Sequence, residues 1–379
     1  MKTLLAIIAS LPAIALAQAG SPAEKAIAEA RRSIQTSLAR PDGYNALAMA
    51  LARRARETSD VTFYTQAEEA VQRSLNVQPD NYGALRARAW ILLGKHEFAA
   101  ALQLAKTLNK RMPDDLMIYG FLADANAELG NYNDAEKACN WMLKLRPGNI
   151  PALTRAAYLR ELFGDLDGAL ELMNMAYQST AVTEAEDRAW ILTQMAHVKL
   201  TAGKTGDAEQ LLAQANAMFP DYHYALAGLA KVRIAQKRYT DAADLLKRRY
   251  QAAPHAENLY DLAEALDLAG RTEEAADAYA RFEVASAAES DQADNSNREL
   301  IYYFADHAGQ PQRAMEIAGR EYERRRDVYT LDAYAWALHV NGRDVEARVY
   351  LDTALAVGSR DTRLLAHSRA IPASHALVP

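Results

Sequence analysis

The sequence predicts an all-α solenoid of about nine antiparallel helix-turn-helix repeats. Only 17 glycines and 12 prolines occur among the 379 residues and alanine is frequent, which favours helices over a β-sandwich. Glycines and alanines also recur along the chain in a fixed register. With 50% hydrophobic and 24% charged residues, the composition is that of a folded globular protein and not of a disordered chain.

The first residues have the pattern of a cleaved signal peptide. Lys2 precedes an apolar run from Leu4 to Ala17 that ends in the small-x-small sequence Ala15-Leu16-Ala17, and this run is too short to span a bilayer. We therefore expect residues 1–17 to be removed and the mature chain to be periplasmic or secreted; a buried N-terminal helix is the alternative. No cysteine follows the cleavage region, so no lipid anchor is expected. Residues 18–41 should form an N-terminal helix or cap.

Turn positions recur at intervals of 33 to 39 residues. They are Gly94, Gly130, Gly164, Gly203, Lys237, Gly270, Gly309 and Gly342. An alanine follows each of them by five residues, at Ala99, Ala135, Ala169, Ala208, Ala242, Ala275, Ala314 and Ala347. Another alanine stands seven residues before each turn except one, where Tyr302 interrupts the series: Ala87, Ala123, Ala157, Ala196, Ala230, Ala263 and Ala335. A period near 34 residues is typical of helix-turn-helix repeats.

Helix packing explains why small residues stand at fixed positions. Two antiparallel helices approach closely only where small side chains face each other. The glycine allows the chain to reverse between them. Pro147, Pro220 and Pro254 each follow a turn position by seventeen residues, where proline ends the second helix and sets the start of the next repeat.

On these residues the chain resembles the tetratricopeptide repeat superfamily. The best single repeat is Leu116 to Asn149, which contains Tyr119, Leu122-Ala123, Gly130-Asn131-Tyr132, Ala135 and Pro147 in the order of that family. The resemblance extends from about residue 42 to residue 361. It implies a right-handed superhelix whose first helices line a concave groove, and it implies a scaffold for protein partners.

The repeats divide into two predicted subdomains. The first covers residues 42–288 and the second covers residues 289–361. Between them, residues 285–297 are polar and predict either a flexible bend or an extended helix. Residues 362–379 should form a C-terminal cap and tail, because the apolar stretch from Leu364 to Ile371 can cover the last helix pair.

The resemblance places residues six, ten and thirteen positions before each turn on the concave surface. Helical periodicity then names the groove residues, which are rich in aromatic and charged side chains. The predicted set is Arg88, Asp124, Arg155, Tyr158, Trp190, His197, Lys231, Tyr260, Asp261, Glu264, Glu299, Tyr303, Asp306, Asp332 and Trp336. Carboxylates dominate its second half, so we expect the partner to present a basic segment to residues 256–340.

The leading functional hypothesis is a non-enzymatic scaffold or adaptor of the cell envelope that binds a peptide or protein in the groove. The alternative is a recognition subunit for cell-wall material or polysaccharide, in which tyrosines and tryptophans stack on sugar rings; a hydrolase is a minor alternative. The net charge of −6 disfavours a nucleic-acid partner. No segment after the leader is apolar and long enough to be a transmembrane helix.

Known catalytic and cofactor motifs are absent from the sequence. The histidines form no HExxH pair, and no GxGxxG loop, phosphate-binding loop or GxSxG elbow occurs. The single cysteine, Cys139, excludes an internal disulfide and a CxxC zinc site, and its register places it on the packed face of a second helix. We therefore expect no enzyme activity, no metal and no cofactor.

Overall fold

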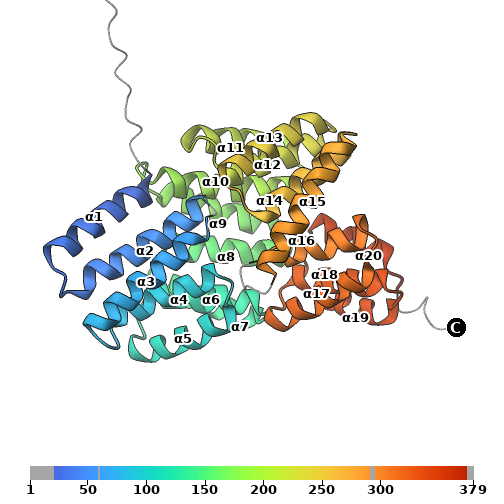
Figure 1. Ribbon diagram of the computed structural model, residues 1–379. Helices are drawn as coiled ribbons and strands as arrows, with labels where there is room; N and C mark the ends of the chain where they lie inside the picture. The colour runs from blue at the N-terminus through green and yellow to red at the C-terminus, as the bar shows by residue number, and fades with distance from the viewer. Residues whose placement is uncertain (1–20, 59, 291–294, 374–379) are drawn as a thin grey trace, which may run out of the picture.

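The computed structural model describes residues 21–58, 60–290 and 295–373, and the predicted signal peptide lies outside them (Figure 1). All regular secondary structure in these residues is helical. The helices are α1 (Pro22–Thr36), α2 (Pro41–Thr58), α3 (Thr62–Val77), α4 (Tyr82–Gly94), α5 (Phe98–Arg111), α6 (Leu116–Glu128), α7 (Tyr132–Leu145), α8 (Ile150–Leu162), α9 (Leu166–Ser179), α10 (Ala185–Thr201), α11 (Thr205–Met218), α12 (His223–Ala235), α13 (Tyr239–Ala252), α14 (Ala256–Leu268), α15 (Thr272–Glu289), α16 (Asn297–Tyr302), the π-helix η1 (Tyr303–His307), α17 (Pro311–Arg324), α18 (Val328–Val340), α19 (Asp344–Leu355) and α20 (Thr362–Ala370).

Consecutive helices pack in pairs, as the repeat pattern predicts. Nine pairs follow one another in the described part of the chain, from α2 with α3 to α18 with α19. Helix α1 packs on α2 at the start, and α20 packs on α18 and α19 at the end. The predicted all-α solenoid of about nine helix pairs is confirmed. None of the helices within residues 21–58, 60–290 and 295–373 combines the length and apolar character needed to cross a membrane.

The second repeat turns two residues later than the sequence predicts. Helix α4 continues through Gly94, and the residue in the left-handed region is His96, with φ of 59°. Gly94 instead allows close helix packing, because a Cβ there would lie 2.3 Å from the ring of Tyr64. The prediction of Gly94 as a turn position is therefore wrong. The prediction that Ala99 is the small residue at the helix contact is wrong as well, because Ala99 is exposed and Ala101, two residues later, is fully buried.

The connections that precede α10 and α16 differ from each other. Helix α15 runs for 18 residues to Glu289, so the extended-helix alternative for residues 285–297 is correct as far as that residue. The other connection lies between Ser179 and Ala185, and it is followed by a 17-residue first helix, α10. Tyr302, which interrupts the alanine series, is buried and directly precedes the π-helical turn η1.

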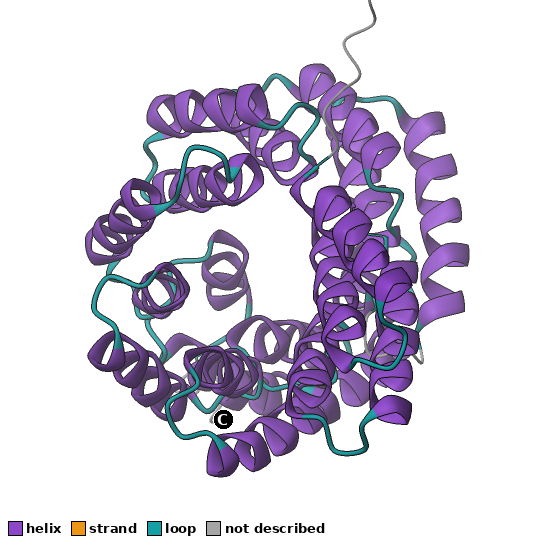
Figure 2. Ribbon diagram, turned by 90° about the vertical axis from the view of Figure 1, so that its left-hand side faces the viewer, coloured by secondary structure: helices purple, strands orange, loops and turns teal. Residues whose placement is uncertain are grey.

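The helix pairs curve into a ring in which late repeats contact early ones (Figure 2). One hydrophobic cluster contains residues of α6–α8 together with residues of α18–α20, among them Leu162 and Leu351. The backbone N–H of Arg326 donates to the carbonyl oxygen of Glu128 at 3.1 Å. The backbone N–H of Val328 donates to the hydroxyl of Tyr132 at 2.8 Å. We call this contact the closure interface; it makes the ninth repeat a neighbour of the third and fourth.

A second contact across the ring involves the end of α2. The guanidinium of Arg56 forms an ion pair with Glu186, which is fully buried, and another with Asp187 at 2.7 Å. The hydroxyl of Tyr222 donates to the other carboxylate oxygen of Glu186 at 2.6 Å. These contacts join the first repeat to the fifth and sixth, so the ring is held at two places.

Candidate binding site inside the superhelix

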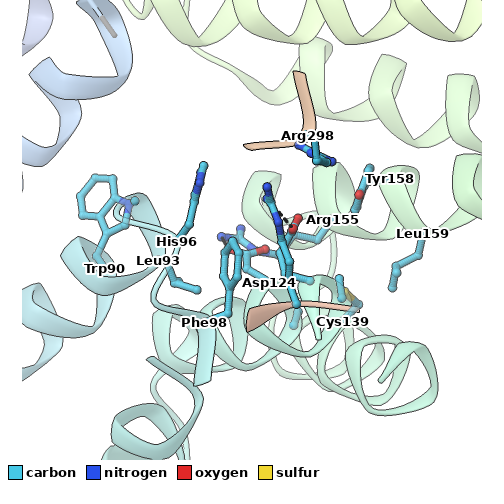
Figure 3. Close-up of a pocket in the computed structure, with 15 residues that line it drawn as sticks. Trp90, Leu93, His96, Phe98, Asp124, Cys139, Arg155, Tyr158, Leu159 and Arg298 are labelled. Carbon is cyan, nitrogen blue, oxygen red and sulfur yellow. Dashed lines mark hydrogen bonds and ion pairs between the residues drawn. The ribbon is translucent and has the colours of Figure 1, made fainter. Parts of the chain in front are cut away.

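A cavity of about 350 Å³ lies where the closure interface brings repeats two to four against repeat eight (Figure 3). It is lined by residues of α4 to α8, of the turn between α4 and α5, of α16, and by the residue after α17. The lining residues are Trp90, Leu93, Gly94, His96, Phe98, Ala123, Asp124, Ala127, Glu128, Cys139, Arg155, Tyr158, Leu159, Arg298 and Arg325.

Arg155 is fully engaged with Asp124 at the base of the cavity. Its Nε donates to Oδ1 of Asp124 at 2.7 Å and its Nη2 donates to Oδ2 at 2.6 Å. Nε is shared with the carbonyl oxygen of Gly120 at 3.2 Å, and Nη1 donates to the carbonyl oxygen of Pro151 at 3.0 Å. Such a two-point ion pair holds both side chains in one orientation. Arg155 therefore has a structural role and leaves little charge available to a ligand.

Arg298 differs from Arg155 because its donors are unused. Its guanidinium points into the cavity (Figure 3) and makes no hydrogen bond within the described part of the chain. The nearest carboxylate is that of Asp327, at 3.7 Å. Asp327 already accepts hydrogen bonds from the backbone N–H groups of Tyr329 and Thr330 at the start of α18. Arg298 thus presents a planar set of donors to the cavity.

Glu128 and His96 are among the titratable groups of the cavity whose pKa values are shifted. Burial, reinforced by the charge of Asp327, raises the pKa of Glu128 to about 7, although Arg325 and Arg298 oppose this effect. Burial, reinforced by Arg325 and Arg298, lowers the pKa of His96 to about 3. His96 is therefore neutral at pH 7, and Glu128 is about half protonated.

The predicted groove residues of the first half are mostly in this cavity. Asp124, Arg155 and Tyr158 line it. Arg88 does not, because the later turn at His96 moves the groove position to Trp90. That prediction is wrong for a local reason: a non-glycine residue took the left-handed conformation, and the nearby glycine was mistaken for the turn.

Trp90, Arg298 and Arg325 are among the lining residues that the sequence did not predict. Trp90 would have been found with the correct register of the second repeat. Arg298 and Arg325 come from α16 and the end of α17 in repeat eight, far along the chain from the other lining residues. No repeat pattern signals that they face α6 and α8, because this contact depends on the closure of the ring.

The second half of the predicted groove is covered by the last helix. The imidazole of His367 on α20 pairs with the carboxylate of Asp332 at 2.9 Å and stacks on Trp336 with ring centroids 4.1 Å apart. The guanidinium of Arg363 on α20 reaches Glu264 at 3.5 Å. Asp332 is only 3% exposed. Helix α20 therefore occupies the inner face of the last repeats.

The remaining carboxylates of this half also have partners in the chain. Arg249 forms an ion pair with Asp261. Asp306 accepts a hydrogen bond from Nε1 of Trp336 at 2.8 Å. Burial raises the pKa of Glu299, and the charge of the adjacent Arg298 opposes that rise. The acidic wall is thus largely neutralised by the protein's own cations, which leaves little of the attraction that was expected for a basic partner segment.

The tyrosines of this half are packed as well. Tyr260 is 1% exposed, and its hydroxyl donates to Glu264 at 2.9 Å. The hydroxyl of Tyr303 donates to Glu283 at 3.1 Å. Neither ring lies free on a groove wall, so these two predicted groove residues are structural in the closed ring.

The middle repeats keep inner-face side chains open. Lys231 on α12 is exposed. The imidazole of His197 on α10 is 40% exposed and pairs with Glu161 at 2.9 Å. Trp190 on α10 is half-buried between two hydrophobic clusters. These three residues form the open part of the predicted groove, and we call them the α10–α12 surface.

No metal site occurs in the described residues, where no cluster of three or more His, Cys, Asp or Glu side chains could hold an ion. Cys139 is buried in the cavity wall, and burial raises the pKa of its thiol to about 12. A thiol with this pKa stays protonated at pH 7 and is a poor nucleophile.

Comparison with known proteins agrees with the architecture. Two family models described as tetratricopeptide repeat match the chain, one over residues 86–150 and one over residues 199–255. No curated protein matches the sequence significantly. Several solved structures share the fold at low sequence identity, which by itself establishes the fold alone.

Two of these structures illustrate the likeness. The APC/C hetero-tetramer Cut9–Hcn1 is similar with a TM-score of 0.55 and 13% identity; the match covers 92% of this chain but only 59% of that one. The human IFIT1 dimer with m7Gppp-AAAA is similar with a TM-score of 0.54 and 13% identity over 88% of this chain and 85% of that one. Residues 86–150 and 199–255 therefore carry tetratricopeptide repeats, and the nine helix pairs of the described residues share their helix-turn-helix architecture.

Proposed function

We propose that this protein is a non-catalytic interaction scaffold, exported to the cell envelope, that holds a peptide or protein segment on the α10–α12 surface. The fold is generally a scaffold for protein partners, and the chain carries no catalytic motif in its sequence. The export part of the proposal rests on the leader-like pattern of residues 1–17.

One observation carries the choice of surface. Elsewhere, the predicted groove is closed by the protein itself: α20 covers the last repeats, and the closure interface covers the third and fourth. Lys231 is exposed and the imidazole of His197 is partly exposed, and the repeat register assigns both to the groove. A partner segment that reaches them would also meet the ring of Trp190, and aromatic side chains contribute large areas to recognition at small entropic cost.

The experiment is a crosslinking pull-down from envelope extract with the purified mature chain. Lys231→Glu should lower the recovery of the partner, and Lys247→Glu, an exposed lysine on the second helix α13, should leave it unchanged. Equal recovery with both variants would refute the α10–α12 surface. Binding in a parallel glycan array without any recovered protein would favour polysaccharide recognition instead.

The location is tested separately. The full chain should be found in the envelope fraction with a mature terminus at Gln18, whereas a chain lacking residues 1–17 should stay in the cytoplasm. An intact terminus at Met1 in the cytoplasm would contradict export without affecting the partner experiment.

A further inference from the structure

We propose that the cavity between repeats two to four and repeat eight binds a small anionic ligand, a carboxylate or phosphate group on an aromatic or apolar body, with Arg298 as its main contact. This site is separate from the α10–α12 surface and does not depend on the protein partner. Two features of the cavity support the assignment: the unused donors, those of Arg298 above all, and an apolar wall.

Hydrogen-bond donors without partners face the cavity. Besides the guanidinium of Arg298, the hydroxyl of Tyr158 and the indole Nε1–H of Trp90 make no hydrogen bond within the described residues. All three side chains are half-buried, and their donors are available to an acceptor bound in the cavity. An anionic oxygen group supplies several acceptors at once.

Arg298 differs from the other two arginines of the cavity wall in how it is paired. Arg155 is neutralised by Asp124 at 2.6 Å, and Arg325 is paired with Glu321 at 2.7 Å. Arg298 is the third arginine of the wall, and its nearest carboxylate oxygen lies beyond hydrogen-bond distance at 3.7 Å. Its planar donor fork matches the geometry of a carboxylate or phosphate. Asp327 and the half-ionised Glu128 offset the charge of Arg298, so this arginine offers a ligand its hydrogen-bond donors and not a net positive charge of the cavity.

The opposite wall is apolar. Trp90, Leu93 and Phe98 line it (Figure 3), and they come from α4 and α5. The volume of about 350 Å³ lies at the lower end of the range for small-molecule pockets. A ligand that fits both walls thus has an anionic end near Arg298 and a ring or short aliphatic chain against Trp90.

The site exists only in the closed ring. Arg298 comes from the eighth helix pair, whereas Trp90 and Tyr158 come from the second and fourth pairs. A ligand that contacts both groups binds the closed ring better than an opened one. By linkage, it must stabilise the closure.

The test uses isothermal titration calorimetry on the purified mature chain with two probes, phenyl phosphate and 3-phenylpropionate, and with 3-phenylpropanol as the neutral control. We expect at least one anion to bind with an affinity in the millimolar range or better, and the alcohol to bind at least about tenfold more weakly. Tighter binding of phenyl phosphate would identify a phosphorylated ligand, and tighter binding of 3-phenylpropionate would identify a carboxylic acid.

Variants make the assignment specific. Arg298→Gln should weaken anion binding by about tenfold or more, and Tyr158→Phe, which removes one neutral donor, by about threefold to tenfold. Arg40→Gln removes an arginine that is 72% exposed and should have no effect. Circular dichroism and thermal melts verify that the variants are folded. If Arg298→Gln does not fold, Tyr158→Phe still tests the proposal. Absence of binding by both anions at about 10 mM, or equal binding by the folded Arg298→Gln or Tyr158→Phe variant, would overturn it.

Discussion

The closure interface can be tested by adding one methyl group at Gly130. This glycine has φ of +76°, and a Cβ built on it would lie 2.6 Å from the carbonyl oxygen of Arg326. Gly203 is a matched control, since it has φ of +74° and nothing within 4 Å of such a Cβ. Alanine at either position adopts the disfavoured left-handed conformation, but only at Gly130 does it also push against repeat nine.

The structure sets the size of the difference. A left-handed alanine costs about 1 to 2 kcal/mol, and this cost is common to both variants. At Gly130 the carbonyl of Arg326 must also move by about 0.8 Å to reach an ordinary contact distance of 3.4 Å. That movement strains two hydrogen bonds, from Arg326 to Glu128 and from Val328 to Tyr132, each contributing about 1 kcal/mol. We expect Gly130→Ala to lower the free energy of unfolding by about 1 to 2 kcal/mol more than Gly203→Ala.

Urea unfolding followed by circular dichroism measures the stability difference, and small-angle X-ray scattering measures the ring. Gly130→Ala should increase the radius of gyration, because the ninth repeat separates from the third and fourth, whereas Gly203→Ala should leave it unchanged. Identical unfolding free energies and identical scattering for the two variants would show that the closure contributes nothing in solution.

Three other predictions follow from individual side chains. The pKa of Glu128 is raised from 4.5 to about 7 among Asp327, Asp124, Arg325 and Arg298, so the folded state binds the proton more tightly and the native chain loses stability as the pH rises between these values. The Glu128→Gln variant should not show this loss, and urea titrations should find it about 1 to 2 kcal/mol more stable than the native chain at pH 8 but not at pH 4.5. If the unfolding free energies of the two proteins change in parallel with pH, the prediction is wrong. Asp332→Asn should lower the free energy of unfolding by about 2 to 3 kcal/mol, because it breaks the buried pair with His367. The control Asp306→Asn changes an exposed carboxylate and should lower it by less than about 1 kcal/mol. Equal decreases in the two variants would mean that the packing of α20 does not depend on this pair. Lys237 is exposed and has φ of 59°, a left-handed conformation that strains a lysine but not a glycine, so Lys237→Gly should raise the free energy of unfolding by about 1 kcal/mol. Lys247→Gly, within the helix α13, should lower it by a similar amount. A decrease in both variants would refute the strain at Lys237.

The sequence by itself determined the helices and their pairing. Small residues such as Ala135 and Ala123 stand where two helices touch, and Gly130 stands where the chain reverses. These relations involve residues within one repeat or its neighbour, and such local interactions leave a periodic pattern. The one local error, Gly94 for His96, arose because a glycine also serves close packing, against Tyr64, and the pattern does not distinguish the two uses.

The tertiary structure alone decided which surfaces remain open. Each repeat is rotated slightly against the next, and these small rotations accumulate until the ninth repeat meets the third and fourth. No single pair of adjacent repeats encodes that meeting. It places Arg298 opposite Tyr158 and creates the cavity, while α20 reaches across the last repeats to pair with Asp332. The candidate site therefore could not be predicted from the periodic pattern, since it joins residues that are 140 positions apart in the chain.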